Sequence, residues 1–286
     1  MDPSPMTART TSSFRTPGGM RLAYEERGAA GSPPVILAHG GGQTRHTWRS
    51  TADMLVDSGF RTIAYDSRGH GESDWDQAGD YSLSAYSADM RALSAELAPA
   101  PILIGASLGG LTSLAACAFS PQLEARAVIL LDVAPQLNPA GIERIRSFMM
   151  SHPDGFETVE QAAEAVARYK GARRRASSAT GLARNLRQHP DGRFRWHWDP
   201  AMLSLNNEMQ DSAFAHLSEA VRTVSVPLLL IRGASSDVVT DAEVRAFQSL
   251  MPHCTVAEVS GAEHMIVGDQ NEMANAIIAD FLREFA

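Results

Sequence analysis

The chain has 286 residues, enough for two domains of about 150 residues or for one α/β domain with an insertion. Hydrophobic residues make up 44% and charged residues 20%, and the 22 glycines and 15 prolines show no repeat, which excludes disordered, collagen-like and coiled-coil chains. The formal net charge of −8 argues against broad, sequence-independent binding to nucleic-acid phosphates.

The cysteine content and the N-terminus predict a protein of the reducing cytoplasm. Cys117 and Cys254 are too few for a disulfide framework. Residues 1–13 are polar and contain two prolines, which predicts a flexible tail rather than a secretory signal. The chain has no apolar run of about 18 residues, so we expect a soluble protein without a membrane span.

Short β-rich segments alternate with helical patterns, as is typical of a mostly parallel sheet covered by helices on both faces. The first two strands form an expected antiparallel pair around a Pro-Gly-Gly turn at residues 17–19. Eight strands are predicted, at residues 13–16, 20–27, 34–38, 61–65, 101–105, 127–131, 227–232 and 255–259. The helices between them are predicted at residues 47–58, 83–97, 108–119, 241–250 and 271–284.

This alternation stops between residues 135 and 226, where helical periodicity continues without a convincing strand. We therefore expect a helical cap at residues 136–223, inserted into an α/β core formed by residues 14–135 and 224–286. Helices of the cap are predicted at residues 139–150, 158–169, 179–188 and 211–223.

The strongest chemical signal is the G-x-S-x-G sequence GASLG at residues 105–109, between an expected strand and an expected helix. A sharp turn there holds the hydroxyl of Ser107 clear of the sheet, and the flanking glycines remove side chains that would clash. The alternative is an ordinary Ser-Gly turn that closes a βα unit. The position between strand and helix favours Ser107 as a nucleophile.

A serine hydroxyl attacks at neutral pH when an imidazole takes its proton and a carboxylate orients that imidazole. Of the nine histidines, His264 follows the last expected strand and is the candidate base. Asp237, which follows the preceding strand, is the first candidate acid. Asp132, at the end of the strand AVILLD, is the alternative acid. It could instead have a purely structural role in closing the end of this strand.

A negatively charged tetrahedral intermediate also needs hydrogen-bond donors. The sequence HGGG at residues 39–42 follows the strand VILA, and its lack of side chains allows backbone N–H groups to face the oxyanion. We expect the N–H groups of Gly41 and Leu108 to form this oxyanion hole, the second helped by the dipole of its helix. A flexible turn or a phosphate loop is the alternative, but the P-loop pattern is absent.

Over residues 20–286, these motifs resemble the α/β-hydrolase superfamily, in particular its capped members. The segment DSRGHGES at residues 66–73 is similar to the family's D-x-R-G-H-G-x-S loop, which implies structural roles for Asp66, His70 and Ser73. Two features depart from the family pattern: GAEH replaces the frequent GAGH around His264, and the cap carries no substrate motif. The resemblance implies the α/β-hydrolase fold, and a serine at the elbow disfavours epoxide hydrolase and dehalogenase chemistry.

We interpret the chain as a serine hydrolase that cleaves a small carboxylic ester or lactone through an acyl-enzyme. No metal or organic cofactor, nucleic acid or membrane is expected as a partner, and the protein is expected as a monomer or a homodimer. Carbon–carbon bond hydrolysis and cofactor-free perhydrolysis with the same triad are alternative reactions. A non-catalytic ligand receptor on the same fold is an alternative from another class.

The cap is expected to select the substrate. Gly42, Trp198, Met149 and Met150 are candidate pocket residues, although packing of the cap on the core explains the same side chains. Residues 170–195 contain eight basic residues and one acid, Asp191, a local charge of +7. This segment is either a solvated cationic surface or an entrance that attracts anionic substrates.

Overall fold

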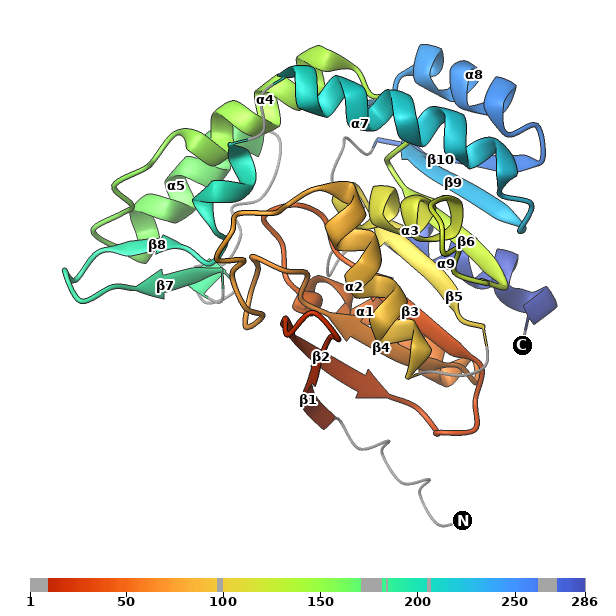
Figure 1. The fold of residues 1–286 in the computed structure, drawn as a ribbon. Helices are drawn as coiled ribbons and strands as arrows, with labels where there is room; N and C mark the ends of the chain where they lie inside the picture. The colour runs from red at the N-terminus through yellow and green to blue at the C-terminus, as the bar shows by residue number, and fades with distance from the viewer. Residues whose placement is uncertain are drawn as a thin grey trace.

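The computed structural model describes residues 10–96, 100–170, 182–183, 185–204, 207–261 and 272–285. An eight-stranded sheet forms the core, in the order β1-β2-β4-β3-β5-β6-β9-β10 (Figure 1). The pairs β1–β2 and β2–β4 are antiparallel and all other neighbours are parallel. The strands are β1 (Thr10–Arg15), β2 (Arg21–Arg27), β3 (Pro34–Ala38), β4 (Arg61–Tyr65), β5 (Ile102–Ala106), β6 (Ala127–Leu131), β9 (Leu228–Gly233) and β10 (Cys254–Val259).

Helices cover both faces of this sheet because the central strands are apolar on both sides. In β6, Val128 and Leu130 belong to one apolar cluster, whereas Ile129 and Leu131 belong to the other. The first cluster includes side chains of α2 (Leu83–Ala95), α3 (Leu108–Ala118) and α8 (Asp241–Leu250). The second includes side chains of α1 (Arg49–Asp57) and α9 (Glu272–Leu282). The predicted α/β sheet with helices on both faces is confirmed.

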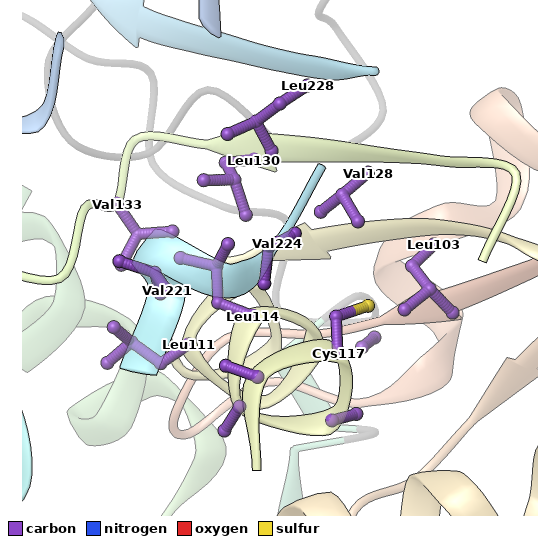
Figure 2. Packing of buried hydrophobic residues seen from close by; sticks show 14 of the residues in the cluster. Leu103, Leu111, Leu114, Cys117, Val128, Leu130, Val133, Val221, Val224 and Leu228 are labelled. Carbon is purple, nitrogen blue, oxygen red and sulfur yellow. The ribbon is translucent and has the colours of Figure 1, made fainter. Parts of the chain in front are cut away.

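Helix α3 is the most deeply buried helix of the core, with every residue from Gly109 to Ala118 buried. Figure 2 shows Leu111, Leu114 and Cys117 of this helix among apolar side chains of β5, β6 and the segment that returns from the cap. Val221 and Val224 provide the contacts of that segment, and both are buried. Packing on all sides therefore fixes the N-terminal end of α3, where the candidate nucleophile lies.

The cap lies between β6 and β9 in sequence and covers one end of the core (Figure 1). It contains a two-stranded antiparallel sheet in addition to helices. A cap cluster of apolar side chains, including Phe156, Trp196 and Trp198, gives it an interior of its own. Its elements are α4 (Pro139–Met150), α5 (Val159–Lys170), β7 (Leu186–Gln188), β8 (Phe194–Trp196), the 3-10 helix η2 (Pro200–Leu203), α7 (Asn207–Ala220) and the 3-10 helix η3 (Val221–Thr223).

The strands β7 and β8 differ from the helix predicted at residues 179–188. Four of its ten residues lie outside the described residues, and its last three residues form β7. The missed signal is the Pro-Asp-Gly sequence at residues 190–192, because Gly192 takes a φ of +81° between the strands and Asp191 accepts a hydrogen bond from the Arg193 N–H. Within the described part of the chain, no helix is long and apolar enough to cross a membrane.

Candidate active site

Ser107 occupies a strained turn between β5 and α3. Its φ of +47° and ψ of −117° are unusual for a residue with a side chain. The flanking glycines make the turn possible: a Cβ on Gly105 would lie 2.4 Å from the Gly109 backbone, and one on Gly109 would lie 2.1 Å from the Ala38 carbonyl oxygen. The chain therefore turns abruptly at Ser107, as the motif predicts, and the serine stays half-buried at the sheet edge.

The glycine loop, which consists of residues 39–42 directly after β3, lies against this serine. A Cβ on Gly40 would lie 3.3 Å from the Ser107 Cβ. The N–H groups of Gly40 and Gly42 donate to Gln43 Oε1 at 3.0 Å and His70 Nε2 at 3.2 Å. The Gly41 N–H makes no hydrogen bond to any described residue, and apart from Gly41 and its chain neighbours no described atom lies within 4 Å of a Cβ built there. The first N–H of α3, on Leu108, has no intrahelical acceptor. Two backbone donors are thus available near Ser107.

Two fully buried histidines hold the glycine loop in place. The ring of His39 accepts the Ser67 N–H at Nε2, 3.0 Å away, and its Nδ1 lies 2.8 Å from the Gly40 carbonyl oxygen. The ring of His70 accepts the Gly42 N–H and contacts the Arg68 carbonyl oxygen through Nδ1 at 2.9 Å. His70 therefore braces the site, as the resemblance implies, and does so through the expected oxyanion loop itself.

The rest of the loop at residues 66–73 is also structural. Asp66 is fully buried and accepts hydrogen bonds from the Arg45 N–H at 2.7 Å and the Glu72 N–H at 2.9 Å, and it forms an ion pair with the Arg45 guanidinium. The Ser73 hydroxyl donates to the Asp66 carbonyl oxygen at 2.5 Å. In the described residues, no group of three or more His, Cys, Asp or Glu side chains is arranged to hold a metal ion.

A third buried histidine, His197 of the cap, approaches the same loop. Its Nδ1 accepts the Gly71 N–H at 2.8 Å, and its Nε2 lies 3.3 Å from the Gly42 carbonyl oxygen. Burial lowers the pKa of His39 from 6.5 to about 4 and that of His70 to about 3. Burial, and then the proximity of His70, holds the pKa of His197 well below 6.5. All three rings are therefore neutral at pH 7.

These pKa shifts predict a loss of stability in mild acid. The unfolded chain takes up these protons near pH 6.5, whereas the folded protein takes them up only at much lower pH, so the stabilisation is complete above pH 6.5 and falls as the pH drops. Each ring should contribute about 2 kcal/mol to the decrease in unfolding free energy between pH 7 and pH 5. Urea unfolding at the two pH values measures this decrease.

A histidine variant tests the source of the pH effect. His197→Asn removes one titrating group and should reduce the pH-dependent decrease by about 2 kcal/mol. Equal unfolding free energies of the wild type at pH 7 and pH 5 would contradict the prediction.

The two candidate acids lie in different surroundings. Asp132 is fully buried at the end of β6 with a φ of +51°. Its carboxylate accepts the Gly233 N–H at 3.0 Å and the Ser236 hydroxyl at 2.6 Å. Since Ala106 pairs with Leu131 in the parallel ladder, Ser107 and Asp132 follow directly after paired residues at the same sheet edge. The Ser107 N–H donates to the Leu131 carbonyl oxygen at 3.1 Å, which extends this pairing up to the nucleophile.

Asp237 faces the cap and the solvent. Its side chain is 41% exposed and accepts a hydrogen bond of 2.8 Å from Arg144, a 47% exposed residue of α4. The Arg144 guanidinium also lies 5.5 Å from the centre of the Tyr169 ring. His264, the candidate base, lies outside the described residues, so the acid that contacts it stays a prediction.

Three of the four expected pocket residues lie together. A Cβ on Gly42 would lie 3.2 Å from the Trp198 ring and 3.4 Å from the Met149 methyl group. The Trp198 ring stacks on Trp196 with a centroid distance of 4.8 Å, which supports it from the cap interior. Met150 is 52% exposed. An apolar surface of the cap therefore adjoins the glycine loop.

In the basic segment of the cap, each arginine whose side chain is described makes hydrogen bonds within the protein. Arg187 donates to the Gly71 carbonyl oxygen, Arg193 to the Asp154 carbonyl oxygen at 2.8 Å, and Arg195 to Asp191 at 2.7 Å. The arginines at positions 173–175 and 184 lie outside the described residues. The three described arginines thus stabilise the cap and its contact with the core.

Comparison with known proteins identifies the family. A family model described as the alpha/beta hydrolase fold matches residues 33–270. The chain belongs to the α/β-hydrolase family. This hydrolase is 30% identical to the esterase Rv0045c of Mycobacterium tuberculosis over 256 residues, which cover 85% of the chain and 80% of the relative. It is 29% identical to the 2-(acetamidomethylene)succinate hydrolase of Mesorhizobium japonicum over 269 residues, covering 93% and 92% of the two chains.

Solved structures agree with this membership. A crystal structure of E-2-(acetamidomethylene)succinate hydrolase superimposes with a TM-score of 0.79 at 26% identity, covering 96% of this chain and 99% of the other. A structure of the M. tuberculosis esterase Rv0045c gives a TM-score of 0.76 at 27% identity, covering 98% and 93%. The fold of this α/β hydrolase thus recurs over nearly the whole length of both solved structures.

Proposed function

We propose that this hydrolase is a serine esterase that cleaves a small carboxylic ester or lactone through an acyl-enzyme. The observation that carries the proposal is the elbow: Ser107 has a φ of +47° and lies beside two backbone N–H groups with no acceptor in the described structure. A hydroxyl next to two backbone donors is suited to attack a carbonyl and bind the oxyanion that results.

The proposed reaction has two steps. Ser107 Oγ attacks the carbonyl carbon while His264 takes the hydroxyl proton, and the N–H groups of Gly41 and Leu108 donate to the oxyanion. The tetrahedral intermediate collapses, His264 protonates the leaving alcohol, and an acyl-serine remains. A water molecule then attacks the acyl-serine with His264 as base, which releases the carboxylic acid and restores the Ser107 hydroxyl.

We assign the acid of the triad to Asp132 in preference to Asp237. A triad carboxylate must stay ionised and hold one orientation against an imidazole. The two donors to Asp132, Gly233 N–H and the Ser236 hydroxyl, hold its carboxylate in one plane. Asp237 instead forms an ion pair with Arg144 of the cap. The chain order of nucleophile, acid and base is the same for either assignment.

The side chains of the cap favour a substrate that carries an apolar group. Trp198 and Met149 lie against Gly42, next to the proposed oxyanion donor Gly41. Trp198 is 5% exposed and its ring is held by Trp196, so this wall is rigid. The relative in M. tuberculosis is named an esterase, in agreement with ester chemistry at this elbow.

Labelling and turnover together test the proposal. A fluorophosphonate probe should label Ser107 stoichiometrically, with the modified residue located by mass spectrometry. A panel of p-nitrophenyl esters of increasing chain length, lactones and a dienone acid should show turnover of esters or lactones. Absence of labelling would favour a ligand receptor, and labelling with turnover of the dienone acid alone would favour carbon–carbon bond hydrolysis.

A further inference from the structure

His197 is a buried residue of the cap that belongs to neither the proposed triad nor the apolar wall. It follows β8 directly, is 2% exposed, and its backbone N–H donates to the Asn185 carbonyl oxygen at 3.1 Å. Its ring bridges two loops of the core, through Gly71 and Gly42. A cap side chain therefore makes polar contact with the glycine loop beside Ser107.

The hydrogen bonds determine where the protons of the ring lie. A backbone N–H only donates, so Nδ1 of His197 accepts from Gly71 and is unprotonated. In a neutral ring the proton is then on Nε2, from which it is donated to the Gly42 carbonyl oxygen. The same reasoning places the proton of His70 on Nδ1, because its Nε2 accepts from the Gly42 N–H.

Three histidines thus hold three successive peptide units of the loop. His39 contacts the carbonyl oxygen of the unit between Gly40 and Gly41, and in a planar trans peptide this fixes the Gly41 N–H on the opposite side. His70 accepts the N–H of the next unit, and His197 donates to the carbonyl oxygen of the third. Glycine units are the most flexible of all residues, so their orientation depends on such contacts.

Of these three contacts, two come from the core and one comes from the cap. We propose that His197 is a positioning residue for the oxyanion hole: by holding the Gly42 carbonyl oxygen, the cap adds a restraint on the glycine loop that keeps the Gly41 N–H in the orientation set by His39. The inference rests on the proposed function for the role of Gly41. It implies that the cap contributes to the rate of the chemical step as well as to the choice of substrate.

Two variants of similar shape distinguish a role of His197 in positioning the glycine loop from a role in attaching the cap to the core. The side-chain oxygen of His197→Asn lies near the position of Nδ1 and keeps the Gly71 bond, but the donor to Gly42 is lost. The amide nitrogen of His197→Gln lies near the position of Nε2 and keeps the donor to Gly42, but the Gly71 bond is lost. Each variant loses one hydrogen bond between cap and core, so an anchoring role predicts equal effects.

The positioning role predicts unequal effects on catalysis. His197→Asn should lower kcat for a p-nitrophenyl ester about 10- to 100-fold, somewhat less than the loss of a whole oxyanion donor, with KM nearly unchanged. The affinity of a trifluoromethyl ketone, which forms a tetrahedral adduct, should fall in parallel. His197→Gln should keep kcat within about threefold of the wild type. Equal values of kcat for the two variants would overturn the inference.

A matched control removes a different hydrogen bond between cap and core. The Tyr81 hydroxyl donates to Asp199 of the cap and accepts the Asp76 N–H, and in the described structure neither Tyr81 nor Asp199 is hydrogen-bonded to the glycine loop. Tyr81→Phe should therefore lower Tm about as much as His197→Asn while leaving kcat unchanged. A loss of kcat in Tyr81→Phe equal to that in His197→Asn would show that any loosening of the cap has this effect, and would also overturn the inference.

Glycine amides give a readout that does not depend on turnover. In 15N-glycine-labelled protein, His197→Asn should speed hydrogen exchange of the Gly42 amide and shift the Gly41 and Gly42 resonances, whereas Tyr81→Phe should not. Unchanged exchange and shifts in His197→Asn overturn the inference even if the wild type hydrolyses every ester. Conversely, a wild type that hydrolyses no ester and takes no phosphonate refutes the proposed function, while the exchange data still decide whether His197 positions the loop.

Discussion

Ser107→Ala should reduce ester turnover by about 10⁴-fold or more while the protein stays folded. The alanine keeps the backbone turn, since the flanking glycines at positions 105 and 109 remain and one hydroxyl alone is removed. Without that hydroxyl no acyl-enzyme forms, and the remaining rate comes from substrate binding and the oxyanion donors. Steady-state kinetics with a p-nitrophenyl ester, alongside a thermal unfolding curve, measure both parts of the expectation.

Ser113→Ala is the matched control for this experiment. Ser113 lies on the same helix, is fully buried, and its hydroxyl donates to the Gly109 carbonyl oxygen at 2.8 Å. Its removal should change Tm slightly and leave kcat near the wild-type value. If Ser107→Ala retained more than about a tenth of the wild-type kcat, the covalent mechanism would be refuted.

Asp132→Asn should lower kcat by up to about 10⁴-fold, whereas Asp237→Asn should lower it by less than about tenfold. An amide at position 132 favours the wrong tautomer of the imidazole and no longer stabilises its charged form. Ser236→Ala should give an intermediate loss, because it removes one of the two donors that orient the Asp132 carboxylate. The readout is kcat for an ester across the three variants, with far-UV circular dichroism to verify folding.

A double-mutant cycle identifies what Asp237 does. If its carboxylate serves the cap through Arg144, then Asp237→Asn and Arg144→Ala should have similar small effects, and the double variant should be no worse than either. A 10⁴-fold loss in Asp237→Asn, together with a small effect of Arg144→Ala, would move the acid from the end of β6 to the loop after β9.

Local sequence patterns were sufficient to predict most of the core. The strands at residues 34–38, 61–65 and 127–131 are observed with the predicted bounds, because each is a short apolar run buried on both faces. The elbow at Ser107 was equally predictable, since few sequences place glycines two residues before and after a serine between a strand and a helix. These signals lie within a few residues of one another in the chain.

Features that depend on distant segments were not predictable in the same way. The donors to Asp132 come from the last residue of β9 and the loop after it, 101 and 104 residues away, and the sequence around the strand AVILLD does not indicate them. His197 was not among the candidate site residues, because its partner Gly42 is 155 residues distant in the sequence. The hairpin of the cap was missed although its Pro-Asp-Gly turn is local, since two strands of three residues are too short to show an alternating pattern.

The segment that leads from the cap back to the sheet limits where the cap could be replaced by the cap of a related enzyme. Leu217 of α7, Val221 and Val224 are buried in the apolar cluster that includes α3. Figure 2 shows Val221 and Val224 beside this helix. A chimaera joined at residue 223 would therefore import foreign side chains into the recipient's interior, beneath the nucleophile. The part of the cap that can be exchanged ends before Leu217. A junction placed there would allow caps with different substrate preferences to be combined with this core while its native interior is preserved.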